Sequence, residues 1–499
     1  MSFYILLLVF VSSFACLCLW RNSNKETETK ELPPGPRKLP IVGNLLQFGE
    51  LTHRSLYTLS LRHGPLMFLQ LGSYPAIVVS SADTAREIFK NHDNAVLNRP
   101  TTFAVRKLFY GCSDMAFTPY GEYWREVKKL CTLKLFTLKR TQSFRAVREE
   151  EVSLLMESIA RSSSTVINLS ELILALVNNI VCRIVFGKKY GETGEAYGSK
   201  SRFYDNLAEH QAFSGAITLA DFFPHLEWIH KFTGLEFKVQ KIFRQFDDLL
   251  DEVIEAHENA EVRRSDHEDL VDVLLKVQQG TSLRIPLTMN NVKGVLMDIF
   301  VAGTDTSSSL IVWAMTELMR NPSVMRKAQA ELRRELGKKE RVEESDLHGL
   351  EYLRNVIKET LRLHPPAPLS VPRETTEKFT IGGYTIPAKT RVFVNVMAIG
   401  LDPKYWECPG EFRPERFFQN PVDYRGQHFE LIPFGTGRRS CPGISFAVPA
   451  VELVLANLLH CFDWELPPGM EKEDLDLKET IGITTHKKIP LCLVATAKI

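Results

Sequence analysis

The chain has 499 residues, of which 44% are hydrophobic and 24% are charged, and its formal net charge at pH 7 is +1. This composition is ordinary for a globular protein with a sizeable core, and a near-zero charge without a long basic run argues against a nucleic-acid-binding protein. The nine cysteines are scattered without a CxxC pair, which argues against a zinc site or a disulfide framework and favours reduced thiols facing the cytosol.

The N-terminus begins with an uncharged run, residues 2–20, which as a helix spans about 28 Å and matches the hydrocarbon core of a bilayer. Basic residues follow the run, starting at Arg21, so the positive-inside rule leaves the bulk of the chain on the cytoplasmic side. A cleaved signal peptide is the alternative, but no basic residue precedes the apolar run. We expect a single-pass signal anchor at 2–20, a polar tether and proline-rich hinge at 21–44, and one large domain at 45–499.

The first part of that domain combines a predicted hairpin with a long loop. Residues 66–71 and 76–80 are apolar, rich in β-forming residues and joined by a Gly-Ser-Tyr-Pro turn, which predicts two paired strands. Residues 101–120 are predicted to be a loop with several aromatic side chains, Phe109 among them. Aromatic side chains in a loop either line a pocket or pack beneath the loop.

Trp124 and Lys128 are four residues apart and therefore share one face of a predicted helix. An indole N–H and a cation on one face are suited to binding an anionic carboxylate. The alternative is an amphipathic helix with surface lysines.

Further along, residues 203–258 contain two helical patterns around a middle segment that is rich in aromatic residues.

A long buried helix is predicted between an N-cap at Thr288 and Asn321-Pro322, because apolar residues recur there at i, i+3, i+4 and i+7. Its middle, 302–306, contains a glycine, two threonines and an aspartate, which weaken a helix or compete for its backbone bonds. Such a conflict between local sequence and helix is typical of a functional site. Thr306 can instead bond back to its own helix, and Asp305 can be a solvated or paired carboxylate.

Glu359 and Arg362 lie three apart near the end of another predicted helix and can form an ion pair on one face. If exposed, such a pair contributes well under ~1 kcal/mol.

The most informative stretch is 433–443, in which Cys441 stands among glycines and arginines just before an apolar helical pattern. Glycine at 435, 437 and 443 lets the backbone turn tightly and approach a flat ligand. The positive end of the following helix and the nearby arginines favour a thiolate, which is a metal ligand. The alternative is a buried structural cysteine in a glycine-rich turn.

Phe434, Gly437, Arg439, Cys441 and Gly443 match the FxxGxRxCxG signature, and the chain therefore resembles the cytochrome P-450 superfamily of haem-thiolate enzymes. The resemblance implies a mainly α fold with small β-sheets, a single haem-thiolate catalytic domain at 45–499, and a haem b whose iron is ligated by Cys441.

Other segments match the same family in the same order. Residues 302–306 fit its AGxDT element, Trp124 and Lys128 resemble its WxxxR element with lysine in place of arginine, and Glu359, Arg362 and Arg416 match its structural ExxR and PERF elements. By resemblance, Thr306 and Asp305 guide protons in catalysis. The implied haem-binding residues are Cys441, Arg439, Phe434, Gly437, Gly443, Arg373, Trp124, Lys128, Ala302 and Gly303.

The implied reaction is a monooxygenation that consumes dioxygen and NADPH. The chain shows no GxGxxG nucleotide motif, so a separate NADPH-cytochrome reductase is the expected partner, docking on the thiolate side. The chain looks like a plant microsomal member of the large clan that decorates specialised metabolites, which implies the endoplasmic reticulum membrane.

The expected substrate is a small hydrophobic molecule, such as a terpenoid or a terpene-derived alkaloid. A phenolic or coumarin substrate is the second expectation. The expected substrate-binding residues are Phe109, Phe213, Ile299, Leu369, Val371 and Ile481. Two other functions stay open: a haem-thiolate isomerase or dehydratase that needs no reductase, and a non-catalytic haem-binding or ligand-binding membrane protein.

Overall fold

The computed structural model describes residues 32–189, 202–215, 218–259, 268–280, 284–480 and 482–498. The predicted anchor at 2–20 and Ile481 lie outside these ranges. The α-helices are α2 (Thr52–His63), α3 (Ala82–Asn91), α4 (Phe103–Leu108), α5 (Glu122–Leu130), α6 (Leu138–Ser143), α7 (Arg145–Arg161), α8 (Leu169–Phe186), α9 (Arg202–Ser214), α10 (Ile229–Phe232), α11 (Leu235–Glu258), α12 (Leu270–Gln279), α13 (Met289–Arg320), α14 (Pro322–Leu336), α15 (Glu351–Leu363), α16 (Val396–Gly400) and α17 (Ile444–Cys461). The strands are β1 (Leu66–Leu71), β2 (Tyr74–Val79), β3 (Val166–Asn168), β4 (Arg373–Glu374), β5 (Phe379–Ile381), β6 (Tyr384–Ile386), β7 (Arg391–Val394), β8 (Phe462–Glu465) and β9 (Cys492–Ala497).

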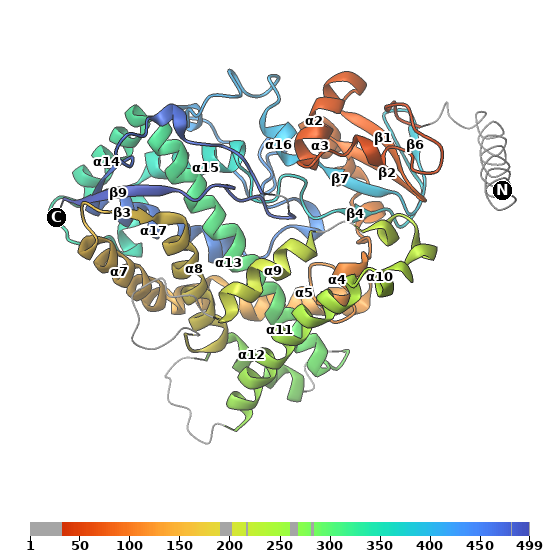
Figure 1. Ribbon diagram of the computed structural model, residues 1–499, viewed down its shortest axis with the longest axis horizontal. Helices are drawn as coiled ribbons and strands as arrows, with labels where there is room; N and C mark the ends of the chain where they lie inside the picture. The colour runs from red at the N-terminus through yellow and green to blue at the C-terminus, as the bar shows by residue number, and fades with distance from the viewer. Residues whose placement is uncertain are drawn as a thin grey trace, which may run out of the picture.

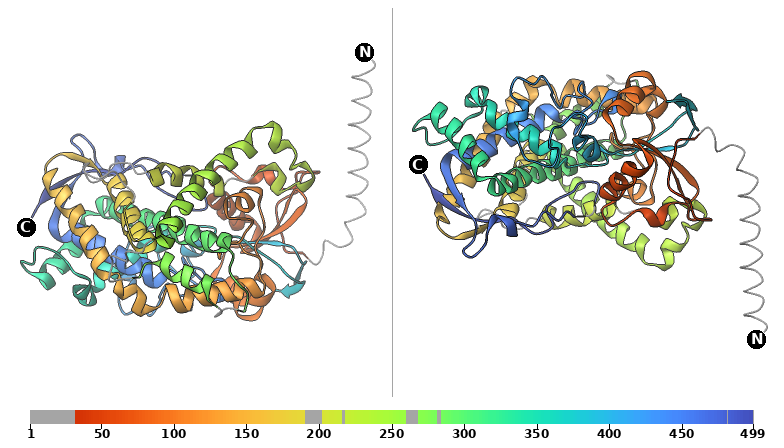
Figure 2. Two further views of the ribbon diagram at one scale, coloured as in Figure 1. Left: turned by 90° about the horizontal axis from the view of Figure 1, so that it is seen from below. Right: turned by 90° about the horizontal axis from the view of Figure 1, so that it is seen from above.

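The fold is mainly helical, as predicted, and its long helix α13 runs through the middle of the molecule (Figure 2). Thr288 caps α13 as expected: its hydroxyl accepts the amide N–H of Asn291, whose side chain in turn accepts the amide N–H of Thr288. The helix ends at Arg320, just before Asn321 and Pro322, because proline favours an extended residue before it. The predicted boundaries of this helix are therefore confirmed.

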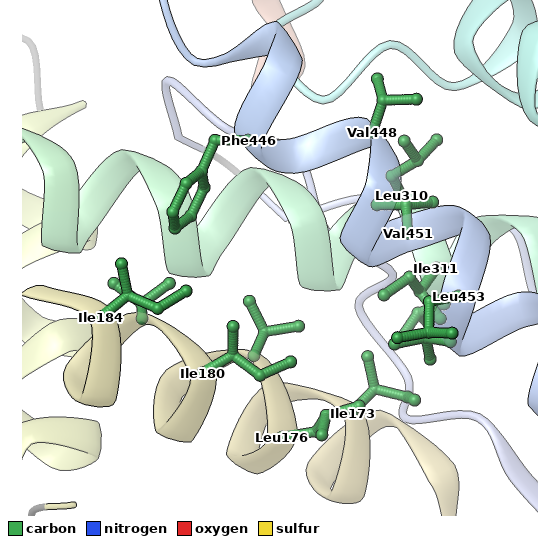
Figure 3. Packing of buried hydrophobic residues seen from close by; sticks show 14 of the residues in the cluster. Ile173, Leu176, Ile180, Ile184, Leu310, Ile311, Phe446, Val448, Val451 and Leu453 are labelled. Atoms are coloured by element: carbon green, nitrogen blue, oxygen red, sulfur yellow. The ribbon is translucent and has the colours of Figure 1, made fainter. Parts of the chain in front are cut away.

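Helices α8, α13 and α17 form the centre of the core. Figure 3 shows isoleucine and leucine side chains of α8 directed toward Leu310 and Ile311 of α13 and toward α17. All three helices are long and apolar enough to cross a bilayer, yet between 61% and 78% of each apolar window is buried inside the protein. Their hydrophobic residues therefore build the core.

The strands form small sheets at opposite ends of the molecule (Figure 1). The larger sheet has the order β1-β2-β7-β4, and its first two strands pair antiparallel with Leu66 opposite Val79. The predicted hairpin is confirmed, but its second strand begins at Tyr74, within the predicted turn, and ends at Val79. The second sheet has the order β3-β9-β8 and joins the C-terminal strand to the segment between α7 and α8.

The predicted loop at 101–120 contains a short helix, α4, where no helix was expected. Thr102 accepts the amide N–H of Val105 at 3.3 Å and begins α4. Phe103, Val105 and Leu108 are buried, so packing of this apolar face outweighs the shortness of the segment.

The predicted charge network around Glu359 is confirmed and lies fully inside the protein. Arg362 donates to both carboxylate oxygens of Glu359 at 2.7 Å, and Nε of Arg416 donates to the same carboxylate at 2.9 Å. The side chains of Glu359 and Arg362 are 0% exposed. This network ties α15 to the segment that precedes the Cys441 loop.

Candidate active site

A cavity of about 280 Å³ lies between the middle of α13 and the loop that carries Cys441; we call it the inner cavity. Apolar side chains form most of its wall, including Ile299, Leu310 and Val371. The predicted site residues that line it are Trp124, Lys128, Ile299, Ala302, Gly303, Thr306, Val371, Phe434, Arg439, Cys441 and Gly443. Residues widely separated in the sequence therefore meet around one cavity.

The Cys441 loop is held by its own backbone. The amide N–H of Cys441 donates to the carbonyl of Phe434 at 2.9 Å, and the amide N–H of Gly443 reaches the Cys441 Sγ at 3.4 Å. Gly437 has φ of 70°, and a Cβ there would lie 2.5 Å from the carboxylate of Asp93. Gly437 does not line the inner cavity, but its left-handed backbone lets the loop pass close to Asp93.

Burial raises the pKa of the Cys441 thiol above its ordinary value, while the Gly443 N–H and the Lys128 ammonium lower it. The net direction opposes the expectation that the helix start and the arginines alone favour a thiolate. Cys441 retains accessible surface, and this surface faces the inner cavity. A thiolate in such a place needs a further cation, and a bound metal ion is the group that deprotonates a buried thiol.

On the opposite wall, Ala302, Gly303 and Thr306 of α13 face the cavity. The Thr306 hydroxyl donates to the Ala302 carbonyl at 2.8 Å. Thr306 therefore bonds back to its own helix, which is the alternative given for it from the sequence. Asp305 does not line the cavity. Its side chain, 5% exposed, forms an ion pair with His486.

Three guanidinium groups lie near one another beside the inner cavity; Arg99 and Arg439 line it, whereas the predicted Arg373 does not. Arg99, Arg373 and Arg439 are all buried, and their nitrogens donate mainly to backbone carbonyls. Burial lowers the pKa of Arg439 to about 9 and that of Arg373 to about 10. Burial, then repulsion from the other two guanidinium groups, lowers the pKa of Arg99 well below its usual range.

Among the residues that the structure describes, only Arg373 of these three arginines has a carboxylate in direct contact, that of Asp93 at 3.2 Å. Two further donors beside the inner cavity, Lys128 and the Trp124 indole, bind the carbonyls of Ser440 and Met115 at 2.8 and 3.1 Å. Buried cations without enough counter-charge favour an anionic ligand. These side chains fit a flat apolar group that carries carboxylates at one edge and lies against a cysteine. Haem has this shape and charge.

A second space of about 600 Å³, the outer cavity, begins at Ser370, which lines both cavities. Leu369, Phe222, Phe393 and Ile483 contribute to its apolar wall. Leu369 therefore faces the outer cavity, whereas Ile299 and Val371 face the inner one.

The other two predicted substrate-binding aromatics lie in the core. Phe109 is 3% exposed and packs against Phe117 and His210, with ring centroids 4.9 and 5.1 Å away. Phe213 is partly buried against the same core cluster. Neither lines the inner or the outer cavity as described.

Two groups at the site were missed in the sequence. Arg99 stands alone between short apolar and proline segments, and its role depends on contacts with Val371 and Pro372, far along the chain. His486 meets Asp305 across a similar separation. Neither contact could be predicted from local residue spacing. The one local feature that points to Arg99 is its charge, which stands within an apolar stretch.

Comparison with known proteins agrees with this geometry. The sequence model of the cytochrome P-450 family matches residues 33–493. Strychnine-11-hydroxylase of Strychnos nux-vomica is 53% identical over 499 residues, covering 99% of this chain and 98% of that protein. Premnaspirodiene oxygenase of Hyoscyamus muticus is 45% identical over 494 residues, covering 98% and 97%. A solved zebra fish cytochrome P-450 with abiraterone superimposes with a TM-score of 0.74 at 25% identity, covering 90% of this chain and 100% of that one.

Proposed function

The chain belongs to the cytochrome P-450 family and is a haem-thiolate monooxygenase of the plant type; from this premise we propose that it oxidises a terpenoid or a terpene-derived alkaloid. The observation that carries the proposal is the apolar inner cavity, which places Cys441 opposite Ala302 and Thr306. Relatives named for strychnine and premnaspirodiene support this substrate class.

In this proposal Cys441 ligates the iron of haem b, and the cationic edge of the inner cavity binds the haem carboxylates. Arg439, Arg373, Trp124 and Lys128 are the proposed donors, and the missed Arg99 joins them. When bound, the haem supplies the iron centre that binds and activates dioxygen with electrons from NADPH. Phe434 and Gly443 shape the wall around the Cys441 sulfur, and Gly437 supports the loop.

The residues of α13 orient the oxygen-binding space and move protons. Ala302 and Gly303 keep the wall thin opposite Cys441, because neither has a side chain larger than a methyl group. The Thr306 hydroxyl, which now donates to the Ala302 carbonyl, rotates to donate a proton toward the cavity. Asp305, one residue earlier, resupplies that proton.

The substrate is recognised by shape more than by charge. Asp298 lies at the wall of the inner cavity, but one of its carboxylate oxygens accepts the amide N–H groups of Met115 and Ala116 at 2.7 and 2.9 Å. In the outer cavity the carboxylate of Asp221 is likewise used by the amide N–H of Phe103 and by Thr218. Because Asp298 and Asp221 are committed to the fold and the walls are mainly apolar, the pocket favours a neutral skeleton, and an alkaloid would enter unprotonated.

The proposed setting is the endoplasmic reticulum membrane, with residues 2–20 as anchor, 21–44 as tether and hinge, and 45–499 as the catalytic domain on the cytoplasmic side. Trp228, Phe232 and Phe237 support membrane contact, because they are 56%, 82% and 77% exposed and large exposed apolar patches mark interaction surfaces. Hydrophobic substrates then reach the outer cavity from the lipid.

NADPH-cytochrome reductase is the proposed electron donor, docking on the Cys441 side. Lys128 of α5 touches the carbonyl of Ser440, so the same helix carries the exposed Lys129 close to that face. Lys129 and Lys134 offer positive charge to an acidic partner surface.

Microsomes that contain the full-length chain test this function. With reductase and NADPH they are expected to oxidise members of a terpenoid and alkaloid panel, and omission of either component is expected to stop turnover. Equal turnover without NADPH and reductase would contradict the monooxygenase and support an isomerase or dehydratase. Absence of any turnover alongside intact haem binding would support a non-catalytic binding protein.

A further inference from the structure

His486 approaches α13 from the C-terminal loop between Glu479 and Lys487, two residues joined by an isolated β-bridge. The nearest atoms of His486 and Asp305 are the imidazole Nε2 and the carboxylate Oδ1. Their contact is an ion pair whose N–H is not aligned as a hydrogen bond. Burial disfavours the charged imidazolium, but the interactions with the Asp305 carboxylate together outweigh it and raise the pKa of His486 above its ordinary value.

The loop holds this imidazole in a fixed place. Inside the loop, the amide N–H of Thr480 donates to the His486 carbonyl at 2.9 Å, and the amide N–H of His486 donates to the Thr480 hydroxyl at 3.0 Å. The Ser309 hydroxyl, one helical turn after Asp305, donates to the Thr485 carbonyl at 2.7 Å. The loop is therefore fastened to α13 at two successive turns.

The pair connects an accessible group with a buried one. The His486 side chain keeps 29% of its surface exposed, whereas the Asp305 side chain keeps 5%. Asp305 is the charged group that faces the imidazole. The other charges of the loop are engaged elsewhere: Glu479 binds His53 and Arg54, and the Lys487 ammonium interacts with Asp476.

We propose that His486 is the positioning residue of Asp305 and delivers protons to it. The proposal rests on the proposed function, in which Asp305 resupplies the Thr306 hydroxyl. The imidazole rotates to bring its Nε2–H into line with Oδ1 of Asp305, the imidazolium gives that proton to the carboxylate, and the neutral ring then takes a proton from water, so no electron is transferred. Thr306 lies next in the chain and faces the inner cavity, which completes a path from water through His486 and Asp305.

The ion pair is tested without turnover by nuclear magnetic resonance on the full-length, histidine-labelled holoprotein in its diamagnetic ferrous carbon monoxide form. The chain has 13 histidines, and His486→Gln identifies the resonance by its loss. We expect this resonance to titrate above the ordinary histidine pKa in the wild type and at a lower pH in Asp305→Asn. An unchanged titration in Asp305→Asn would overturn the pairing.

Proton delivery is tested by the pH dependence of coupling, measured as product formed per NADPH with a substrate from the panel. Because the imidazolium is the donor, wild-type coupling is expected to fall as pH rises through the His486 titration. Below the His486 titration, His486→Gln is expected to lower coupling roughly 10-fold, and this gap is expected to narrow as pH rises through the titration. His486→Arg keeps the positive charge, so we expect it to hold Asp305 in place. Because arginine does not titrate near the histidine pKa, this variant should lose the pH dependence of coupling in that range.

The matched control is His364→Gln, because His364 makes the other imidazole–carboxylate pair described on α13, with Glu317 at 2.8 Å, stacked on Trp313. This variant is expected to lose stability and to keep the wild-type pH profile. A wild-type profile in His486→Gln, or equal coupling in His486→Gln and His486→Arg, would overturn the proposal. A wild type without NADPH-dependent turnover would instead refute the proposed function and leave the resonance experiment to decide the pairing.

Discussion

Replacing Glu359 by glutamine tests the buried charge network that supports the Cys441 loop region. The carboxylate accepts four donors: two from Arg362, one from Arg416 and the amide N–H of Arg413 at 2.8 Å. Glutamine keeps the shape but turns an NH2 group toward a guanidinium and leaves two buried cations without counter-charge.

The expected cost follows from this burial. Removing one partner of a fully buried pair costs about 3–5 kcal/mol, because the remaining charge stays desolvated. An unfolding entropy of about 2.1 cal/mol/K per residue gives roughly 1 kcal/mol/K for a chain of this length. Glu359→Gln is therefore expected to lower Tm by about 3–5 °C.

The assay is thermal unfolding of the purified holoprotein, followed by circular dichroism. Glu407→Gln is the control, since Glu407 pairs with Arg413 at 2.7 Å while its side chain is 78% exposed, and we expect no shift in Tm. A Glu359→Gln variant that melts within about 1 °C of the wild type would refute the claim that desolvated charges dominate here.

Three further predictions concern pH and coupling. Burial raises the pKa of Asp298 to about 6, so wild-type stability falls as pH rises from about 4 through about 6; Asp298→Asn removes this titration, and the dependence of Tm on pH across this range should flatten, whereas an unchanged slope would contradict the raised pKa. Ion pairs with His53 and Arg54 outweigh burial and lower the pKa of Glu479 to about 2. Glu479→Gln should therefore be less stable than the wild type at pH 7, and the difference in Tm should close as pH falls from about 4.5 toward 2. A difference in Tm that does not depend on pH would contradict the lowered pKa. Thr306→Ala should keep the haem spectrum but divert NADPH electrons to hydrogen peroxide, and tight coupling in that variant would remove Thr306 from the proton path.

Periodic patterns in the sequence predict the core helix α13 well. The cap at Thr288 and the apolar stripe from Val292 are local features, and both are confirmed at their predicted positions. The charge network of Glu359 could also be predicted, because family motifs mark its members. Its burial is a property of packing, which residue spacing alone does not reveal.

Contacts between distant segments could not be predicted in this way. The pairing of His486 with Asp305 and the approach of Arg99 to Val371 each join segments far apart in the chain. Phe109 illustrates the opposite case: its aromatic character in a presumed loop suggested a pocket, but α4 turns it into the core. The direction in which a side chain points depends on tertiary packing that no local pattern encodes.

The claim that Cys441 ligates a haem iron is tested most directly by the difference spectrum of the reduced protein with carbon monoxide. The account predicts that the wild type shows the spectrum of a thiolate-ligated ferrous haem and that Cys441→Ser loses it. Cys408→Ser, at an exposed cysteine away from the cavity, should retain it. An unchanged spectrum in Cys441→Ser would place the ligand elsewhere and contradict the account.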